Sequence, residues 1–122
     1  MNRREFEDCV ADAVEALPPY FRRQLDNVEF VVEDWPDRET LRQAGIRDAA
    51  ELQGWYHGIP TTHRTSAYGL VPPDTISIYR RPIMLACRND DEVRETVNIV
   101  VRHEVAHFFG IDDDRLRELG AY

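Results

Sequence analysis

The sequence predicts a single α+β domain in which a small sheet packs on one long helix. The chain has 122 residues, a length typical of one domain. Its hydrophobic pattern predicts the order helix, strand, strand, strand, helix, helix, and the longest helix covers residues 89–109. Strands and helices that are separated along the chain in this way are typical of α+β proteins. The pattern leaves the order and direction of the strands open.

The first predicted element is an amphipathic helix at residues 3–17, where apolar side chains recur every three or four positions. Pro18 ends this helix, and Pro19 can open a short helical turn that runs to residue 25. Residues 28–33 follow a polar turn and are rich in β-branched and aromatic side chains, which predicts a strand.

The middle of the chain predicts a short helix, two further strands and a loop. The helix covers residues 38–44 and ends at Gly45. Glycines bound a second strand at residues 54–60, and the polar, proline-containing residues 61–73 predict a loop. A third strand is expected at residues 75–79, where polar and apolar residues alternate.

The last third of the chain is predicted to be helical. A helical turn is expected at residues 82–86, and Asn89 is a good N-cap whose capping box Glu92 would complete. β-Branched residues lower the helix propensity of the segment that follows. The cap, the length and Gly110 as a left-handed stop favour a helix over a strand. A short helix at residues 114–119 closes the chain.

Composition and charge argue against several classes of protein. A formal net charge of −8 disfavours binding to the nucleic-acid backbone, because such domains usually carry a basic stripe. Cys9 and Cys87 are isolated, so neither a disulfide framework nor a thiolate metal site is indicated. The chain shows no signal-peptide pattern and no apolar run near the ~18 residues of a membrane helix. We therefore expect a cytoplasmic protein that binds neither nucleic acid nor membrane.

The most informative segment is His-Glu-Val-Ala-His at residues 103–107, inside the long predicted helix. His103 and His107 lie four residues apart, so they share one helix face and both imidazoles can bind one metal ion. Glu104 then projects beside them toward a metal-bound water. This is the H-E-x-x-H pattern of zinc peptidases, and it predicts a Zn²⁺ site in which Glu104 is the general base.

A third metal ligand is expected shortly after the helix. Hydrolytic zinc sites take three protein ligands and leave a position for water, whose pKa the ion lowers toward ~7. A glycine turn follows the helix, and Asp113 beyond it can return a carboxylate to the metal. Asp112 and Asp114 are alternatives, and Glu118 ranks last because it lies too close along the chain to the second histidine.

Three stretches of the chain carry a resemblance to a known family. They are Gly-Ile-Pro-Thr at residues 58–61, Ile-Tyr-Arg-Arg-Pro-Ile at residues 78–83, and His-Glu-Val-Ala-His-Phe-Phe-Gly at residues 103–110. With them the chain resembles the small bacterial zincin-like metallopeptidases, sometimes called minimal zincins, over most of its length. The resemblance implies a small sheet over an active-site helix with a short C-terminal helix. It also implies His103, His107 and Asp113 as zinc ligands.

Two features of the site stay open at the level of sequence. Hydrolysis develops an oxyanion that needs a donor besides the metal, and the upstream candidates are His57, His63, Tyr68 and Tyr79. An exposed edge strand beside the motif helix could also pair with an extended peptide. Residues 75–79 or residues 54–59 could supply that edge.

The leading functional hypothesis is a zinc metallopeptidase, a hydrolase that cleaves peptide bonds in short or unfolded protein segments. The same chemistry would serve a zinc amidase or deacylase that acts on a non-peptide substrate. A third hypothesis is a metal-stabilised binding module without catalysis. Glu104 favours hydrolysis over this last possibility, because a structural zinc does not need a carboxylate beside an open coordination position.

Overall fold

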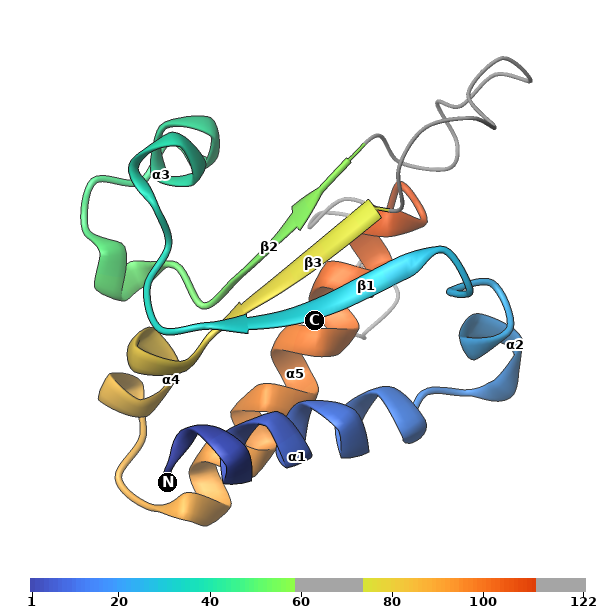
Figure 1. Cartoon of the computed structure of the whole chain (residues 1–122), viewed down its shortest axis with the longest axis horizontal. Coiled ribbons are helices and arrows are strands. Elements are labelled where there is room, and N and C mark those ends of the chain that lie inside the picture. Colours follow the sequence, from blue (N-terminus) through green and yellow to red (C-terminus); the bar gives the residue numbers. More distant parts are fainter. Residues whose placement is uncertain (59–73, 112–122) are drawn as a thin grey trace.

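A small sheet lies over two long helices in the part of the chain that the computed structural model describes, residues 1–58 and 74–111 (Figure 1). The helices are α1 (Arg3–Glu15), α2 (Pro19–Arg22), α3 (Arg38–Ala44), the 3₁₀ helix η1 (Ala49–Glu51), α4 (Arg80–Ala86) and α5 (Asp90–Phe108). The strands are β1 (Val28–Glu33), β2 (Gly54–His57) and β3 (Asp74–Tyr79). This architecture confirms the predicted α+β class with a small sheet on a long helix.

The sheet has the strand order β1-β3-β2, so β3 is its central strand. β1 pairs with β3 in parallel, from Val28 opposite Asp74 onward, and β2 pairs with β3 antiparallel. The hypothesis that residues 75–79 form an exposed edge is therefore wrong, because β3 is hydrogen-bonded along both of its sides. The alternative edge, within residues 54–59, corresponds to β2 in its described part.

The core lies between one face of the sheet and the two long helices. Ile76 and Ile78 of β3 are fully buried there, as are Phe6 of α1 and Val97 and Val101 of α5. The valines of α5 thus belong to the core. Their burial against the sheet outweighs the small loss of helix propensity that made a strand conceivable.

Prolines explain where two helices depart from their expected bounds. α1 ends at Glu15 and not at residue 17 because Leu17 precedes Pro18, and the residue before a proline avoids the helical conformation. α4 begins at Arg80, two positions before Pro82. A proline in the first helical turn loses no helical hydrogen bond, since the N–H groups of that turn have no partner within the helix.

Other differences are local. α2 ends at Arg22, and the chain continues to Leu25 in tighter turns in which the Leu25 N–H donates to the Arg22 carbonyl at 3.2 Å. η1 was not predicted. The expected loop at residues 61–73, the end of the second predicted strand and the helix at residues 114–119 lie outside the described residues.

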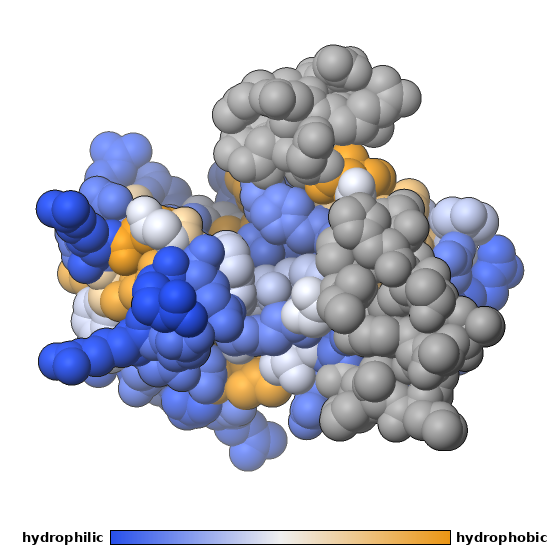
Figure 2. Space-filling model, turned by 90° about the horizontal axis from the view of Figure 1, so that it is seen from above, coloured by the Kyte–Doolittle hydropathy of each residue, from blue (hydrophilic) through white to orange (hydrophobic). Residues whose placement is uncertain are grey.

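The face of the molecule seen from above is mainly hydrophilic, with hydrophobic residues in separate small patches (Figure 2). Within residues 1–58 and 74–111, no helix is both long enough and apolar enough to cross a membrane.

Candidate metal centre

Both ends of α5 are held by side-chain and backbone hydrogen bonds. At the start, the Asn89 side chain accepts a hydrogen bond from the Glu92 N–H at 2.9 Å, which confirms the predicted N-cap. The Glu92 carboxylate does not close the expected capping box on Asn89, because it accepts a hydrogen bond from the Arg88 N–H at 2.8 Å. The Glu92 carboxylate thus binds the N–H of the residue before Asn89 and holds the segment that leads into α5.

The end of α5 is a Schellman motif, in which two backbone bonds close the last turn. Gly110 has a φ of 77° and donates to the His107 carbonyl at 2.9 Å, and Ile111 donates to the Ala106 carbonyl at 2.9 Å. The left-handed stop predicted at Gly110 is confirmed. The chain therefore turns directly after the motif residues. A turn at this point is what the sequence-based hypothesis of a third ligand beyond the helix needs.

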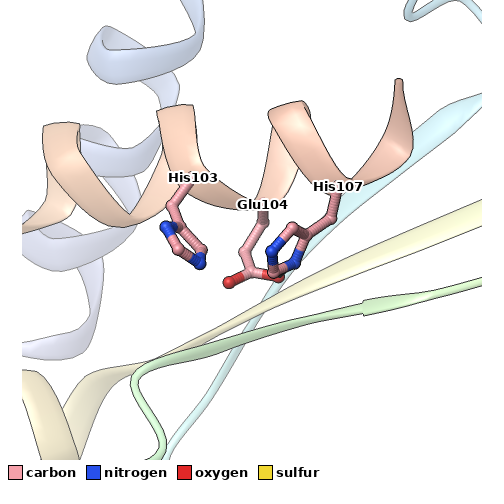
Figure 3. Close-up of side chains that lie close together, drawn as sticks. All are labelled: His103, Glu104 and His107. Carbon is pink, nitrogen blue, oxygen red and sulfur yellow. Dashed lines mark ion pairs between the residues drawn. The ribbon is translucent and has the colours of Figure 1, made fainter. Parts of the chain in front are cut away.

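His103, Glu104 and His107 project from the same side of α5 toward the sheet, with the Glu104 carboxylate between the two imidazoles (Figure 3). One potential ligand atom from each of these side chains lies within 4.8 Å of those of the other two. The imidazole rings are 4.5 Å apart between centroids. The two histidines are half-buried, so a metal ion between them would remain open to the cleft.

Glu104 is a buried carboxylate, only 5% exposed. Its Oε1 lies 3.3 Å from His107 Nδ1, but this contact lacks hydrogen-bond geometry, and no other described residue donates to that oxygen. Buried charges in proteins are generally paired or bound to metals, because an unpaired one loses its hydration without compensation. The orphaned oxygen beside two imidazoles therefore fits a divalent cation, and imidazole nitrogen suits zinc among other transition metals.

Gly54 explains why Glu104 is buried. A Cβ atom at Gly54 would lie 2.6 Å from Val100 Cγ1 and 3.2 Å from Glu104 Cγ. Only a residue without a side chain allows β2 to approach α5 this closely. From the sequence, Gly54 was predicted only to bound a strand. Its close contact with α5 involves residues far away along the chain, so the local sequence does not reveal it.

The three motif side chains open into a cleft of about 410 Å³ between α5 and the segment that leads into β2. On the α5 side, Ile99 and Val100 precede the motif along the same wall. On the other side the wall is formed by Ile46, by η1 and by the start of β2, including Trp55. Val105 and Phe108, the other large apolar residues of this last part of α5, are buried in the core.

Two of the candidate oxyanion donors lie away from this cleft. Ile76 and Ile78 face the core, so Ser77 and Tyr79 point to the opposite face of β3. His57 lies on that same face, with its Nε2 3.1 Å from Ser77 Oγ. Neither His57 nor Tyr79 reaches the motif side chains of α5, and the oxyanion hypothesis is wrong for both.

Tyr79 is instead a structural residue. It is fully buried, and burial raises the pKa of its hydroxyl, while the neighbouring Ser77 and Thr40 side chains offset only part of that rise. The other candidate donors, His63 and Tyr68, lie outside the described residues, as do the possible third ligands Asp112, Asp113, Asp114 and Glu118.

Comparison with known proteins identifies the class. Residues 25–121 match the family described as zincin-like metallopeptidase. The chain belongs to this family. The matched region contains the whole sheet and all of α5, and α1 precedes it. A comparison with curated proteins finds no match.

Proposed function

We propose that this protein is a zinc-dependent peptidase that hydrolyses peptide bonds in short or unfolded segments. The observation that carries the proposal is the buried Glu104 carboxylate, held beside two imidazoles on the wall of an open cleft. The family supports metallopeptidase chemistry in general. A non-catalytic binding module would not require an acidic side chain to be buried at the mouth of an open metal site.

In the proposed mechanism, each motif residue has one task. His103 and His107 hold the metal, with Asp113 as the third ligand. When bound, zinc acts as a Lewis acid that acidifies water and polarises the substrate carbonyl. Glu104 accepts a proton from the attacking water and passes it to the leaving nitrogen. The carboxylate is held for this step by the close packing of Gly54 against its own side chain.

The position of β2 supports an extended substrate. Among the described residues β2 is an edge strand, and the residues at its start line the same cleft as the motif. An edge strand offers unpaired backbone groups to which an extended peptide can bind as an added strand. Folded proteins do not present their backbone in this way, so the preferred substrates are short or unfolded. The described edge covers Gly54–His57.

The decisive experiment measures zinc content and peptide hydrolysis in the same preparations. The wild type is expected to hold about one zinc per chain when purified without chelator, and His103→Ala is expected to lose it. Glu104→Gln should keep the metal and lower hydrolysis by about 10²–10⁴-fold, because only the general base is removed.

Glu95→Gln is the matched control for that substitution, because it removes an exposed carboxylate from the same helix. It should change neither zinc content nor rate. Loss of zinc in Glu104→Gln would mean that Glu104 is a ligand and not the base. Zinc bound without hydrolysis of any peptide would favour the amidase or binding-module alternatives.

The third ligand has its own test. Asp113→Ala is expected to weaken zinc affinity more than Asp112→Ala, because Asp113 has the spacing expected after the glycine of the motif. A competition titration with a chromophoric chelator measures both affinities. The reverse ranking would assign the ligand to Asp112.

A further inference from the structure

β1 forms the edge of the sheet that lies away from the candidate metal centre. Among the described residues β3 is its only strand neighbour, and β2 lies at the opposite edge, beside the motif (Figure 1). The side chains of Val28, Phe30 and Val32 pack against the core. Glu29 and Glu33 alternate with them and are exposed on the other face of the sheet. β1 therefore offers a second strand edge, separate from the one proposed for the substrate.

The direction of the backbone groups of β1 follows from its parallel pairing. The Asp74 N–H donates to the Asn27 carbonyl at 3.1 Å, so position 27 faces β3. In a parallel ladder every second residue of a strand bonds to the same neighbour. The backbone groups of the even-numbered residues of β1 therefore point away from β3, toward the open edge.

Other groups occupy both ends of this edge and leave its middle open. The Val28 N–H donates to the Leu25 carbonyl at 3.0 Å, and the Arg3 side chain donates to the Val32 carbonyl. Between these two bonds, the N–H and the carbonyl of Phe30 face outward without a partner among the described residues. An added strand could bond to both groups.

A groove of about 340 Å³ lies between this edge and α1. Val10 and Val14 of α1 line it together with Phe30 of β1, so much of its surface is apolar. Glu7 and Glu15 of α1 also line it, and the described lining includes no lysine or arginine. Side chains of an added strand that point to the core side of the sheet would enter this groove.

The two glutamates of the groove are only weakly neutralised. Glu7 lies 3.9 Å from Arg3, and Glu15 lies 3.6 Å from Arg22. The glutamate side chains are 52% and 77% exposed, and exposed ion pairs of this kind contribute little free energy. Both carboxylates therefore remain available to a cationic ligand.

The charges on β1 also indicate which occupant the edge suits. Glu29 and Glu33 form no ion pair with a described residue. Two copies of the chain joined along β1 would gather four glutamates on one face of the joined sheet, and like charges on neighbouring strands are destabilising. A basic strand would instead gain favourable cross-strand pairs. The edge thus disfavours a second copy and favours a basic partner.

We propose that the β1 edge binds an extended segment of another protein in which lysine or arginine alternates with an aliphatic residue. In such a strand the basic side chains lie beside Glu29 and Glu33, and the aliphatic ones enter the groove beside α1. Phe30 exchanges backbone hydrogen bonds with the segment, and the bonds at positions 28 and 32 limit its length. This surface lies away from the motif, so the inference is independent of the proposed peptidase function.

The test titrates the protein with a capped Lys-Val-Lys-Val-Lys-Val peptide and follows amide hydrogen exchange by NMR. Every protein sample carries Glu104→Gln, so that hydrolysis at the motif does not interfere. The alternating peptide is expected to bind at least about tenfold more tightly than Lys-Lys-Lys-Val-Val-Val, which has the same composition and charge. At saturation, exchange of the Phe30 amide should slow, while the amides of β2 should exchange as before.

Charge reversal on β1 tests the recognition directly. Glu29→Lys combined with Glu33→Lys should weaken binding of the alternating lysine peptide by at least about tenfold and make Glu-Val-Glu-Val-Glu-Val the preferred ligand. The matched control combines Asp8→Lys with Glu95→Lys, which changes the net charge equally at exposed positions outside the groove. It should leave the preference for the lysine peptide as it was.

Each other outcome overturns the inference. Equal affinities for the alternating and the blocked lysine peptide, or an unchanged preference after charge reversal on β1, would reduce binding to general electrostatic attraction. Slowed exchange confined to β2 would place the peptide at the other edge. No binding of any peptide would mean that the glutamates only protect the edge from strand pairing. A dimer of the free protein with a protected Phe30 amide would assign the edge to a second copy.

Discussion

At the scale of single residues, the site depends on a pair that lies far apart in the sequence. Glu104 is buried because β2 passes close above it, and β2 can do so because position 54 is a glycine. The loss of stability expected from a side chain at position 54 therefore comes from its collision with α5 and not from an unfavourable backbone conformation. Gly45 is the contrasting case. Its φ of 70° favours glycine, but no atom lies within 4 Å of the position that a Cβ would take.

We predict that Gly54→Ala weakens both stability and the metal site. The added methyl group collides with Val100 and Glu104, so β2 and α5 must move apart, and overpacking of this kind costs about 1–3 kcal/mol. Urea unfolding measures the loss of stability, and a zinc titration measures the effect on the site.

Gly45→Ala is the control for Gly54→Ala. It should cost about 1–2 kcal/mol through its left-handed backbone and leave zinc affinity unchanged. Equal loss of zinc affinity in the two variants would show that Gly54 acts on the site only through global stability.

At the scale of elements, α5 is the scaffold that positions the site. It spans 19 residues, with an asparagine cap at its start and a Schellman motif at its end. Three acidic residues occupy its first turn, where they complement the positive end of the helix dipole. The motif lies in the last two turns, so the buried middle of the helix fixes its direction and the glycine stop fixes where it ends.

We predict that Asn89→Ala lowers the free energy of unfolding by about 0.5–2 kcal/mol, because the Glu92 N–H loses its acceptor. Zinc affinity should stay unchanged, since the cap lies at the far end of α5 from the motif. Thermal unfolding and a zinc titration together check both statements.

Asn98→Ala is the matched control within the same helix. Asn98 is exposed in the middle of α5, where alanine has the higher helix propensity, so this substitution should be neutral or stabilising. A loss in Asn98→Ala as large as in Asn89→Ala would contradict the capping argument.

At the scale of the whole molecule, Arg80 connects three segments that are distant in the sequence. Its side chain is 11% exposed and lies at the junction of β3 and α4. Its Nε donates to Asp34 Oδ1 at 2.9 Å, just after β1, and its Nη1 donates to the Met1 carbonyl at 3.1 Å, just before α1. The bridge holds the ends of two strands to the start of the first helix.

This bridge predicts a pH dependence of stability. The hydrogen bond from Arg80 lowers the pKa of Asp34 below its ordinary value of 3.8. A carboxyl whose pKa is lower in the folded state binds fewer protons than in the unfolded chain, so stability rises with pH between the two values. The contribution is fully present above pH 3.8 and is lost as the pH falls through the lowered pKa.

Asp34→Asn should therefore lower the urea midpoint at neutral pH, and its difference from the wild type should shrink in acid below pH 3.8. Asp26→Asn, at an exposed turn before β1, is the control and should change the midpoint little at either pH. A deficit in Asp34→Asn that stays constant from neutral to acid pH would contradict a role for the ionised pair.

Local patterns in the sequence determined most of the elements and the placement of the two motif histidines. The period of the apolar residues placed α1, the N-cap, the length and the glycine stop placed α5, and the bounds of β1 and α3 followed from turn residues and strand composition. The spacing of His103 and His107 was enough to put both imidazoles on one face, because helix geometry fixes that relation. These features depend on residues within a few positions of one another, so one chain without its tertiary context is sufficient to predict them.

Only the tertiary structure decided which strand is central, which glycine allows close approach and which apolar residue of α5 remains exposed. The pairing of β3 with both neighbours excluded it as an edge. The contact of Gly54 with α5 buried Glu104, and the wall opposite α5 turned Ile99 into part of a cleft. Each of these facts joins residues far apart along the chain. The free energy that selects them comes from long-range packing, which local periodicity does not encode.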